Sequence, residues 1–190
     1  MPGGKLHDAL REKNPPPSLK WKVHFTIATG IACGLAYLHL DCHPAIVHGA
    51  IKPRNILLVS DMEPHIVDFS FAQFFDQSSS TPSSSVPAVD VYDYGIVLLQ
   101  LITQKKAVDP SFIEGIEIRS WVRTVLGETG EINKIVDESL AEEVLNPFVL
   151  AQVIDVLKVV LRCTEKNPYM RPTMRDIIRQ LLGKTWLSYR

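Results

Sequence analysis

Two short apolar runs on either side of a polar turn constrain the fold of this chain more than any other stretch. Residues 56–59 read Ile-Leu-Leu-Val, residues 65–67 read His-Ile-Val, and the break at residues 60–64 contains aspartate, glutamate and proline. This order predicts two strands joined by a turn. Antiparallel pairing would bring Asn55, just before the first strand, and Asp68, just after the second, to the same end of the hairpin.

Polar side chains at that end of the hairpin have the composition of a metal and phosphate site. The amide oxygen of Asn55 and the carboxylate of Asp68 are hard oxygen ligands of the kind that Mg²⁺ prefers. The ammonium group of Lys52, three positions before Asn55, would suit a phosphate. Asn55 and Asp68 are therefore the candidate metal ligands, and Lys52 is the candidate phosphate contact.

The stretch that contains this hairpin, residues 46–70, resembles two loops of eukaryotic protein kinases. These are the catalytic loop, His-Arg-Asp-x-Lys-x-x-Asn, and the metal loop, Asp-Phe-Gly. The residues that match position by position are His48, Lys52, Asn55, Asp68 and Phe69.

Three positions in the same stretch depart from the kinase motifs. Gly49 stands in place of the arginine, Ala50 in place of the catalytic aspartate, and Ser70 in place of the glycine. In the family, that aspartate accepts the proton of the substrate hydroxyl, and positioned acid–base groups typically contribute about 10²–10⁴-fold in rate. Because alanine has no group for this role, the resemblance implies severe impairment of catalysis.

The resemblance thus implies a site in which no catalytic group is intact. The degenerate catalytic loop comprises His48, Gly49, Ala50 and Lys52. The residues left for a vestigial nucleotide site are Lys52, Asn55 and Leu57, and those left for a vestigial Mg²⁺ site are Asn55 and Asp68. We expect no cofactor, or at most a remnant of Mg-ATP binding.

Two further landmarks carry the resemblance downstream. Residues 90–95, Asp-Val-Tyr-Asp-Tyr-Gly, match the start of the central kinase helix, which implies that Asp90 accepts hydrogen bonds from the backbone around His48 and Gly49. Arg171 belongs to an Arg-Pro-Thr-Met signature, and in the family its equivalent pairs with a glutamate of an Ala-Pro-Glu motif that this chain lacks. Since an uncompensated buried charge costs roughly 3–5 kcal/mol, we expect Arg171 to be exposed or to meet a substitute carboxylate.

Helical periodicity accounts for much of the remaining chain. A short helix is predicted over residues 5–13, and a long one over residues 19–40 with Ser18 as its N-cap. The buried stripe of the long helix is predicted to comprise Val23, Ile27, Ile31, Leu35 and Leu38. Gly30 and Gly34 should let a neighbouring element approach closely, and His39 and His43 are interpreted as surface or capping residues. Later helices are predicted over residues 96–102, 119–126 and 148–164, followed by a last helix capped by Thr173.

Composition limits the classes of function. With 190 residues the chain has room for one domain, and its net charge of −1 predicts no attraction to nucleic acid or anionic lipid. Its apolar runs are expected to be too short to span a bilayer, and its first residues do not resemble a signal peptide. Cys33, Cys42 and Cys163 are interpreted as free thiols of a reducing compartment, which predicts a cytoplasmic protein.

The resemblance covers the whole chain as one domain, residues 1–190. It predicts a mainly α (α+β) fold, the large C-terminal lobe of a kinase with a small β-hairpin, and an absent N-terminal lobe, because no residue before the catalytic loop spells the glycine-rich lid or the strand lysine. The expected parts are a post-hinge segment (1–17), the central helix and two loops (18–70), a shortened activation segment (71–89) and a helical subdomain (90–190).

The activation segment is expected to be short because Asp68 and Asp90 lie only 22 positions apart, roughly half the separation usual in receptor-like kinases. Its serine-rich part, residues 78–85, is interpreted as a solvated loop, with phosphorylation as the alternative.

Residues 120–140 and 163–178 are similar to the C-terminal part of plant leucine-rich-repeat receptor-like serine/threonine kinases of the group that perceives danger peptides. Three functions remain open. The first is a truncated pseudokinase that acts through protein contacts, with receptor-like kinase cytoplasmic domains or a second copy as partner and an apolar face around Leu57 and Phe69. A partner could recruit it to the inner face of the plasma membrane. The second is residual ATP-binding kinase activity, and the third is a truncated gene product without a function.

Overall fold

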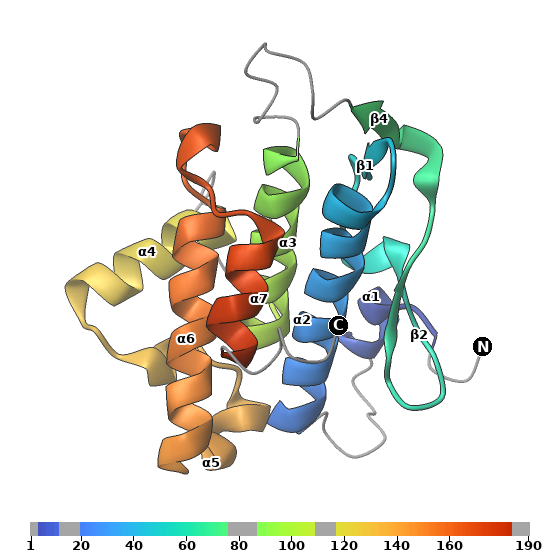
Figure 1. Ribbon diagram of the computed structural model, residues 1–190. Coiled ribbons are helices and arrows are strands. Elements are labelled where there is room, and N and C mark those ends of the chain that lie inside the picture. The colour runs from blue at the N-terminus through green and yellow to red at the C-terminus, as the bar shows by residue number, and fades with distance from the viewer. Residues whose placement is uncertain (1–3, 12–19, 76–86, 109–116, 184–190) are drawn as a thin grey trace.

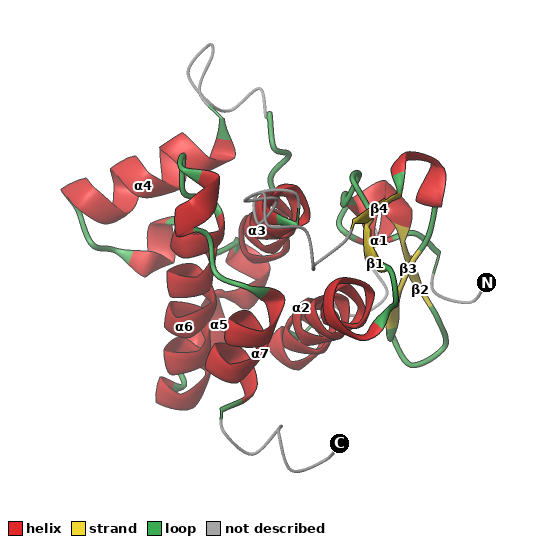
Figure 2. Cartoon of the chain, turned by 45° about the horizontal axis from the view of Figure 1, so that its top comes forward, coloured by secondary structure: helices red, strands yellow, loops and turns green. Residues whose placement is uncertain are grey.

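The computed structural model describes residues 4–11, 20–75, 87–108 and 117–183, in which helices form the body of the molecule (Figure 1). Two small two-stranded antiparallel sheets lie on one side of this body, beside the first helix (Figure 2). The α-helices are α1 (Leu6–Ala9), α2 (Trp21–Ala36), α3 (Ala88–Thr103), α4 (Ile118–Glu128), α5 (Ala141–Val144), α6 (Pro147–Cys163) and α7 (Met174–Leu182). The strands are β1 (Ala45–Val47), β2 (Ile56–Leu58), β3 (Pro64–Ile66) and β4 (Gln73–Phe75). The predicted mainly α (α+β) fold with a β-hairpin is confirmed.

Helix α3 lies at the centre of the core, where it packs against α2 and α6. Its large buried apolar residues are Val91, Tyr94, Val97, Leu98, Leu99, Leu101 and Ile102. Burial of each large apolar side chain contributes about 1.5–3 kcal/mol to folding, so this helix carries a large share of the hydrophobic stabilisation. A helix enclosed on all sides needs this nearly continuous apolar sequence, as predicted for residues 96–102.

Gly95 sets the close approach of α3 and α6. A Cβ atom at this position would lie 2.8 Å from Cγ2 of Thr164 and 2.9 Å from Cβ of Cys163. Cys163 is a fully buried free thiol, and its burial raises the pKa to about 12, so it is an inert part of the core. Cys33 and Cys42 are also free thiols, as predicted.

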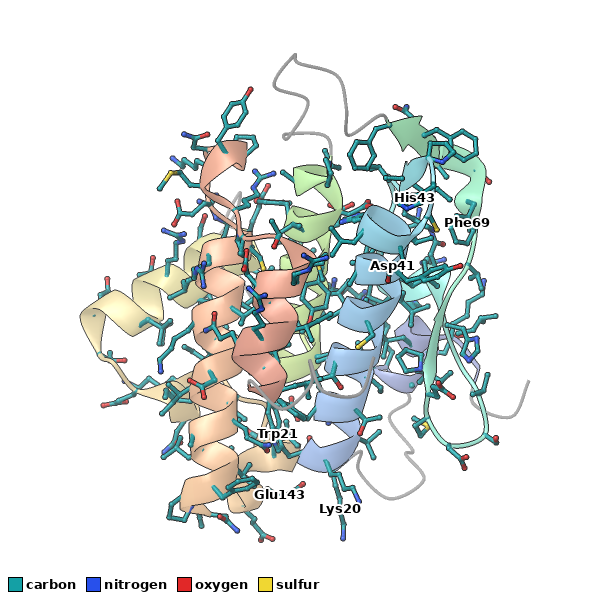
Figure 3. All side chains as sticks on the ribbon, viewed as in Figure 1. Lys20, Trp21, Asp41, His43, Phe69 and Glu143 are labelled. Carbon is teal, nitrogen blue, oxygen red and sulfur yellow. The ribbon has the colours of Figure 1, made fainter. Side chains whose placement is uncertain are left out.

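Helix α2 begins differently from the prediction. It starts at Trp21 with Lys20 as its N-cap and no side-chain cap, so the prediction of Ser18 as the cap is wrong. Tertiary partners take the place of a cap. Figure 3 shows Trp21 and Glu143 at this end of the helix, where the Trp21 backbone N–H donates to Oε1 of Glu143 at 3.0 Å. The Trp21 indole N–H donates to Oε1 of Gln152 at 2.9 Å. Ser18 itself, residues 12 and 13 of the first predicted helix, and the serine-rich residues 78–85 lie outside the described residues.

Four of the five residues of the predicted apolar stripe are buried, whereas Val23 is half-buried. Ile27, Ile31 and Leu35 are fully inaccessible to solvent. The helix continues through a π-helical turn, η1 (Tyr37–Asp41), and the whole stretch from Trp21 to Asp41 is long and apolar enough to cross a membrane, with a mean hydropathy of 1.4. By its length and composition this stretch could span a bilayer, contrary to the expectation that every apolar run is too short to do so. Half of the stretch is buried inside the fold, as in the core helix of a globular domain.

The predicted hairpin is formed by β2 and β3, with Ile56 opposite Ile66 and Leu58 opposite Pro64. The hairpin packs on α2 at Gly30 and Gly34, two positions without a side chain. A Cβ atom on Gly30 would lie 2.5 Å from Cγ of Pro64, and one on Gly34 would lie 3.1 Å from Cδ1 of Ile66. The close approach predicted for the two glycines is thus confirmed. The second sheet pairs β1 with β4, a pairing the sequence pattern does not indicate.

Helices α6 and α7 begin with side-chain caps, of which the sequence predicted the one at Thr173. Helix α6 has Pro147 in its first turn, and its N-cap Asn146 accepts a hydrogen bond from the backbone N–H of Phe148. Helix α7 begins with a capping box in which the Thr173 hydroxyl accepts from the Asp176 backbone N–H and the Asp176 carboxylate accepts from the Thr173 backbone N–H. Caps of this kind typically contribute about 1 kcal/mol each, and the prediction for Thr173 is confirmed.

Candidate functional site

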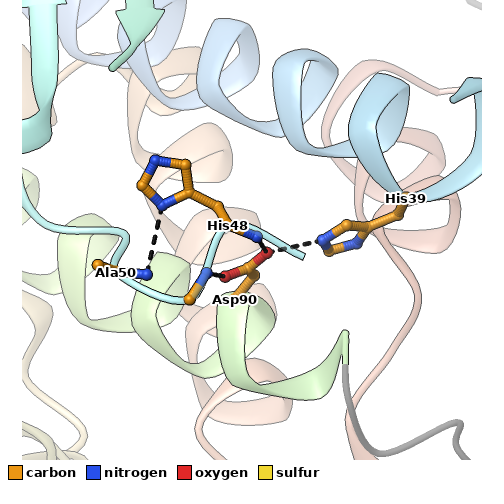
Figure 4. Close-up of polar contacts among 5 residues, drawn as sticks. His39, His48, Ala50 and Asp90 are labelled. Atoms are coloured by element: carbon orange, nitrogen blue, oxygen red, sulfur yellow. Dashed lines mark hydrogen bonds and ion pairs between the residues drawn. The ribbon is translucent and has the colours of Figure 1, made fainter. Parts of the chain in front are cut away.

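The candidate site is built on Asp90, in the first turn of α3. Its carboxylate is fully buried and accepts hydrogen bonds from the backbone N–H groups of His48 (2.7 Å to Oδ2) and Gly49 (2.7 Å to Oδ1) (Figure 4). These are the contacts predicted for it. A buried carboxylate requires such donors, and here they fix the start of the loop that contains Ala50.

His39 supplies a third contact to the same carboxylate. Its Nε2 lies 2.9 Å from Oδ2 of Asp90, and the side chain is buried (Figure 4). The expectation that His39 lies at the surface is therefore wrong. The π-helical turn at the end of α2 places the ring inward, and apolar periodicity carries no signal for such a contact. His43, in contrast, is exposed, as predicted.

The buried side chain of His48 links the catalytic loop at Ala50 to Val67, the residue before Asp68. Its Nδ1 accepts a hydrogen bond from the Ala50 backbone N–H at 3.3 Å, and its Nε2 lies 3.1 Å from the carbonyl oxygen of Val67. Because Nδ1 is the acceptor, the ring proton sits on Nε2 and is donated to Val67. The amide of Asn55 donates from Nδ2 to the Ala50 carbonyl at 3.0 Å. Both backbone groups of Ala50 are thus hydrogen-bonded, while its side chain is only a methyl group.

The hairpin brings Asn55 and Asp68 to one end, since the Val67 backbone N–H donates to the Asn55 carbonyl at 2.9 Å. Asp68 is exposed and adopts a left-handed backbone conformation, with φ of 65°, which is uncommon for a residue other than glycine. The hydroxyl of Ser70 donates to its carboxylate and lowers the pKa of Asp68, with Lys52 and His48 adding to the effect. Asp68 is therefore ionised at neutral pH.

The donor set fits Mg²⁺ only with help from phosphate oxygens. Within the described residues, no group of three or more His, Cys, Asp or Glu side chains could hold a metal ion. Oδ1 of Asn55 and the Asp68 carboxylate supply two oxygen ligands, and Mg²⁺ is commonly held by one or two carboxylates together with phosphates and water. Asn55 and Asp68 would hold such an ion, and exposed Lys52 would face its phosphate. Leu57, assigned to the nucleotide site, is half-buried against α1.

Aromatic residues cover the outer side of the loop. The ring of Phe69 meets the His48 ring edge-on, with centroids 4.8 Å apart, yet Phe69 is 46% exposed. Phe71 and Phe74, which follow it along the chain, are 63% and 73% exposed. This exposed surface, made by Phe69, Phe71 and Phe74, is called the aromatic face below. The apolar face was expected around Leu57 and Phe69; Phe69 belongs to the aromatic face, whereas Leu57 is half-buried against α1.

Asp93 is a site residue that the sequence reasoning missed. It lies one turn after Asp90 on α3 and faces the loop, where the Ile51 backbone N–H donates to its carboxylate. Partial burial raises the pKa of Asp93 to about 6, and the negative charge of Asp90 adds to the effect, while Arg171 and Lys52 oppose it. The spacing of Asp90 and Asp93 was the available signal, because residues three apart share one face of a helix.

Arg171 has neither of the two environments expected for it. It is half-buried, and its guanidinium donates to the carbonyl oxygens of Glu165 (Nε, 2.9 Å) and Ala88 (Nη1, 2.9 Å). The group also lies 4.8 Å from the centre of the Tyr92 ring, a cation–π contact. The prediction that a substitute carboxylate would pair with Arg171 is therefore wrong. Main-chain oxygens and the Tyr92 ring contact its guanidinium group instead.

Comparison with known proteins identifies the family. The protein kinase domain family matches residues 1–187 of the chain. A receptor-like protein kinase of Ipomoea nil is 50% identical over 208 residues, which covers 100% of this chain and 19% of that protein. The leucine-rich repeat receptor-like protein kinases PEPR2 and PEPR1 of Arabidopsis thaliana are 46% and 43% identical, each over 95% of this chain and 19% and 18% of their own length.

The chain thus spans about a fifth of the length of the plant receptor-like kinases that it resembles. The matched region includes the loop anchored by Asp90, the β2–β3 hairpin and the Arg171 contact. This chain belongs to the protein kinase family, and its relatives are leucine-rich repeat receptor-like protein kinases of plants.

Proposed function

We propose that this chain is a kinase-like domain that has lost phosphotransfer and acts through protein contacts in receptor kinase signalling. The observation that carries the proposal is Ala50, which occupies the position of the catalytic base in a loop held in place by hydrogen bonds to Asp90, His48 and Asn55. A general base must come within about 2.6–3.2 Å of the proton that it accepts, and a methyl group offers no acceptor.

The neighbouring carboxylates support this proposal because each is engaged elsewhere. Asp90 is fully buried and bonded to His39, His48 and Gly49. Asp93 faces the Ile51 backbone N–H from inside α3. Both carboxylates accept hydrogen bonds from backbone N–H groups of the loop. Neither is therefore placed to act as the general base that Ala50 lacks.

The alignment length gives a second line of support. The match to the Ipomoea nil kinase runs over 208 positions, 18 more than the 190 residues of this chain, so that relative carries at least 18 residues without a counterpart here. A shortened activation segment, as the short separation of Asp68 and Asp90 predicts, would account for such a difference. A shortened segment would leave less surface to hold a substrate peptide.

The alternative function is residual Mg-ATP binding, favoured by one observation. Asp68 is ionised and exposed, and Asn55 lies at the same end of the hairpin. A thermal-shift titration with Mg-ATP separates the two proposals, because a ligand that binds the folded state raises the melting temperature by mass action. We expect no shift up to millimolar nucleotide. A shift that disappears in Asp68→Asn would establish the alternative.

Protein contacts are tested by capture of partners. We infer a cytoplasmic location, with cytoplasmic domains of receptor-like kinases or a second copy of the chain as partners, and the aromatic face as the contact surface. Retention of a receptor-like kinase domain on the immobilised chain, lost when Phe71 and Phe74 are changed to serine, would support this. Exposed Tyr169→Ser serves as the matched control on η7 (Pro168–Met170). A monodisperse monomer that retains none of these domains would instead favour a product without a function.

A further inference from the structure

An exposed corner lies between α5 and α6, at the far end of the molecule from the β1–β4 sheet (Figure 1). Its four consecutive residues, Leu145, Asn146, Pro147 and Phe148, are all exposed. The side chains of Leu145 and Phe148 are 78% and 71% exposed, among the highest values for large apolar side chains in the described residues. Large apolar side chains gathered in water mark contact surfaces. The corner is therefore a candidate contact surface, separate from the aromatic face.

Hydrogen bonds hold the backbone of this corner in one conformation. Oδ1 of Asn146 accepts from the Phe148 backbone N–H at 2.9 Å, and the Asn146 carbonyl accepts from the Leu150 backbone N–H at 2.9 Å. The ring of Pro147 fixes the φ angle between them. The carboxamide NH₂ of Asn146 donates to no other described residue, so it faces outward as a donor beside the exposed ring. These three residues are called the Asn-Pro-Phe turn below.

The surroundings of the turn are acidic. Residues 135–157 contain five aspartates and glutamates and no lysine, arginine or histidine. Glu142 is exposed, and half-buried Glu143 accepts from the Trp21 backbone N–H at the start of α2. Lys20 lies at the same end of the molecule and offsets part of this charge (Figure 3). A complementary partner surface would carry basic residues around its contact with the turn.

A second turn of the same build provides an internal comparison. Asn167 accepts from the Tyr169 backbone N–H at 3.1 Å, Pro168 lies between them, and Tyr169 is 61% exposed. The flanking charges are of the opposite sign, because Lys166 precedes this turn and Arg171 follows it. The two turns therefore share their backbone design and differ in aromatic side chain and in flanking charge.

We propose that the Asn-Pro-Phe turn is a docking motif for a peptide-binding module of a partner protein. That module would have an apolar pocket for the Phe148 ring, an acceptor for the Asn146 NH₂ and basic residues at its rim. Aromatic anchors that fill a pocket typically carry most of the binding energy of an interface. A turn that is already fixed also loses little conformational entropy on binding. The inference goes beyond the proposed function, because it holds whether or not the chain transfers phosphate.

The test is calorimetric titration of the complete 190-residue chain with a purified EH domain, a module whose ligands are Asn-Pro-Phe tripeptides. We expect saturable binding, which Phe148→Ala should weaken by about tenfold or more. Tyr169→Ser, the matched change in the second turn, should leave the affinity within about twofold.

Asn146→Asp separates recognition from helix capping. Aspartate caps a helix about as well as asparagine does, so this variant keeps the acceptor for the Phe148 N–H and the start of α6. It lacks the NH₂ group. We expect the same melting temperature as the unchanged chain and a loss of affinity of about tenfold or more, even though the added negative charge would favour a basic rim.

Several outcomes would overturn the inference. These are no binding by the unchanged chain, equal affinity of the unchanged chain and Phe148→Ala, equal losses in Phe148→Ala and Tyr169→Ser, and full affinity of Asn146→Asp. If Phe148→Ala does not fold, competition by a free peptide of residues 143–150, with serine for phenylalanine as its control, gives the same comparison. The assay contains neither nucleotide nor a receptor-like kinase domain, so its failure leaves the proposed function standing.

Discussion

Replacement of Asp93 by asparagine should stabilise the protein at pH 7 but leave its stability unchanged near pH 4. The folded-state pKa of Asp93 is raised from 3.8 to about 6, chiefly by burial. Between these two values the unfolded chain releases the proton and the folded chain retains it, so the contribution of this group to stability falls as the pH rises from about 4 to about 6. Above pH 6 the folded protein bears the full cost of the charge.

The size of the effect follows from the shift. One pKa unit corresponds to about 1.4 kcal/mol, so the full cost is about 3 kcal/mol. Asp93 is only half-buried, and water screens part of this, so we expect a gain of about 1–2 kcal/mol in Asp93→Asn at pH 7. Asparagine keeps an acceptor for the Ile51 N–H, so the hydrogen bond is retained.

The measurement is urea unfolding of both proteins from pH 4 to pH 8. The difference in unfolding free energy should grow between pH 4 and pH 6 and then level off. Asp61→Asn, which removes an exposed carboxylate in the turn between β2 and β3, is the matched control and should show little difference at any pH. A pH-independent difference, or a less stable Asp93→Asn at pH 7, would refute the assignment of a destabilised carboxylate at this position.

Two further substitutions test the catalytic loop and the core. Ala50→Asp should not restore transfer of radiolabelled phosphate to a peptide, because the 190 residues contain no glycine-rich lid to cover the triphosphate; label on the peptide would show that the loop alone suffices. Gly95→Ala should destabilise the protein by about 1–3 kcal/mol through overpacking against Cys163 and Thr164. A urea midpoint equal to that of the unchanged chain would show that α6 can move away.

Several features of the site could be predicted because their signals are local. Asn55 and Asp68 flank two short strands, so antiparallel pairing alone brings them together. The glycines of α2 signal a close neighbour because they lack side chains, and Pro64 and Ile66 occupy that space. The Asp90 contacts follow from its motif.

Other features depend on contacts between segments far apart in sequence. His39 is 51 positions from Asp90 in the sequence. Arg171 donates from Nη1 to the carbonyl oxygen of Ala88, which is 83 positions away. The start of α2 is another case, since the Trp21 indole donates to Gln152, 131 positions away. A residue's own neighbourhood in the sequence contains no information about such partners.

The order of motifs and the periodicity of apolar residues by themselves determined the family, the helical body, the hairpin and the loss of an acidic side chain at position 50. Only the tertiary structure decided what His39, Asp93 and Arg171 do. It placed His39 on Asp90, gave Arg171 main-chain oxygens, and buried Asp93 against the loop. The physical reason is that burial and the nearest opposite charge set the cost of ionisation, and both are properties of the packed chain.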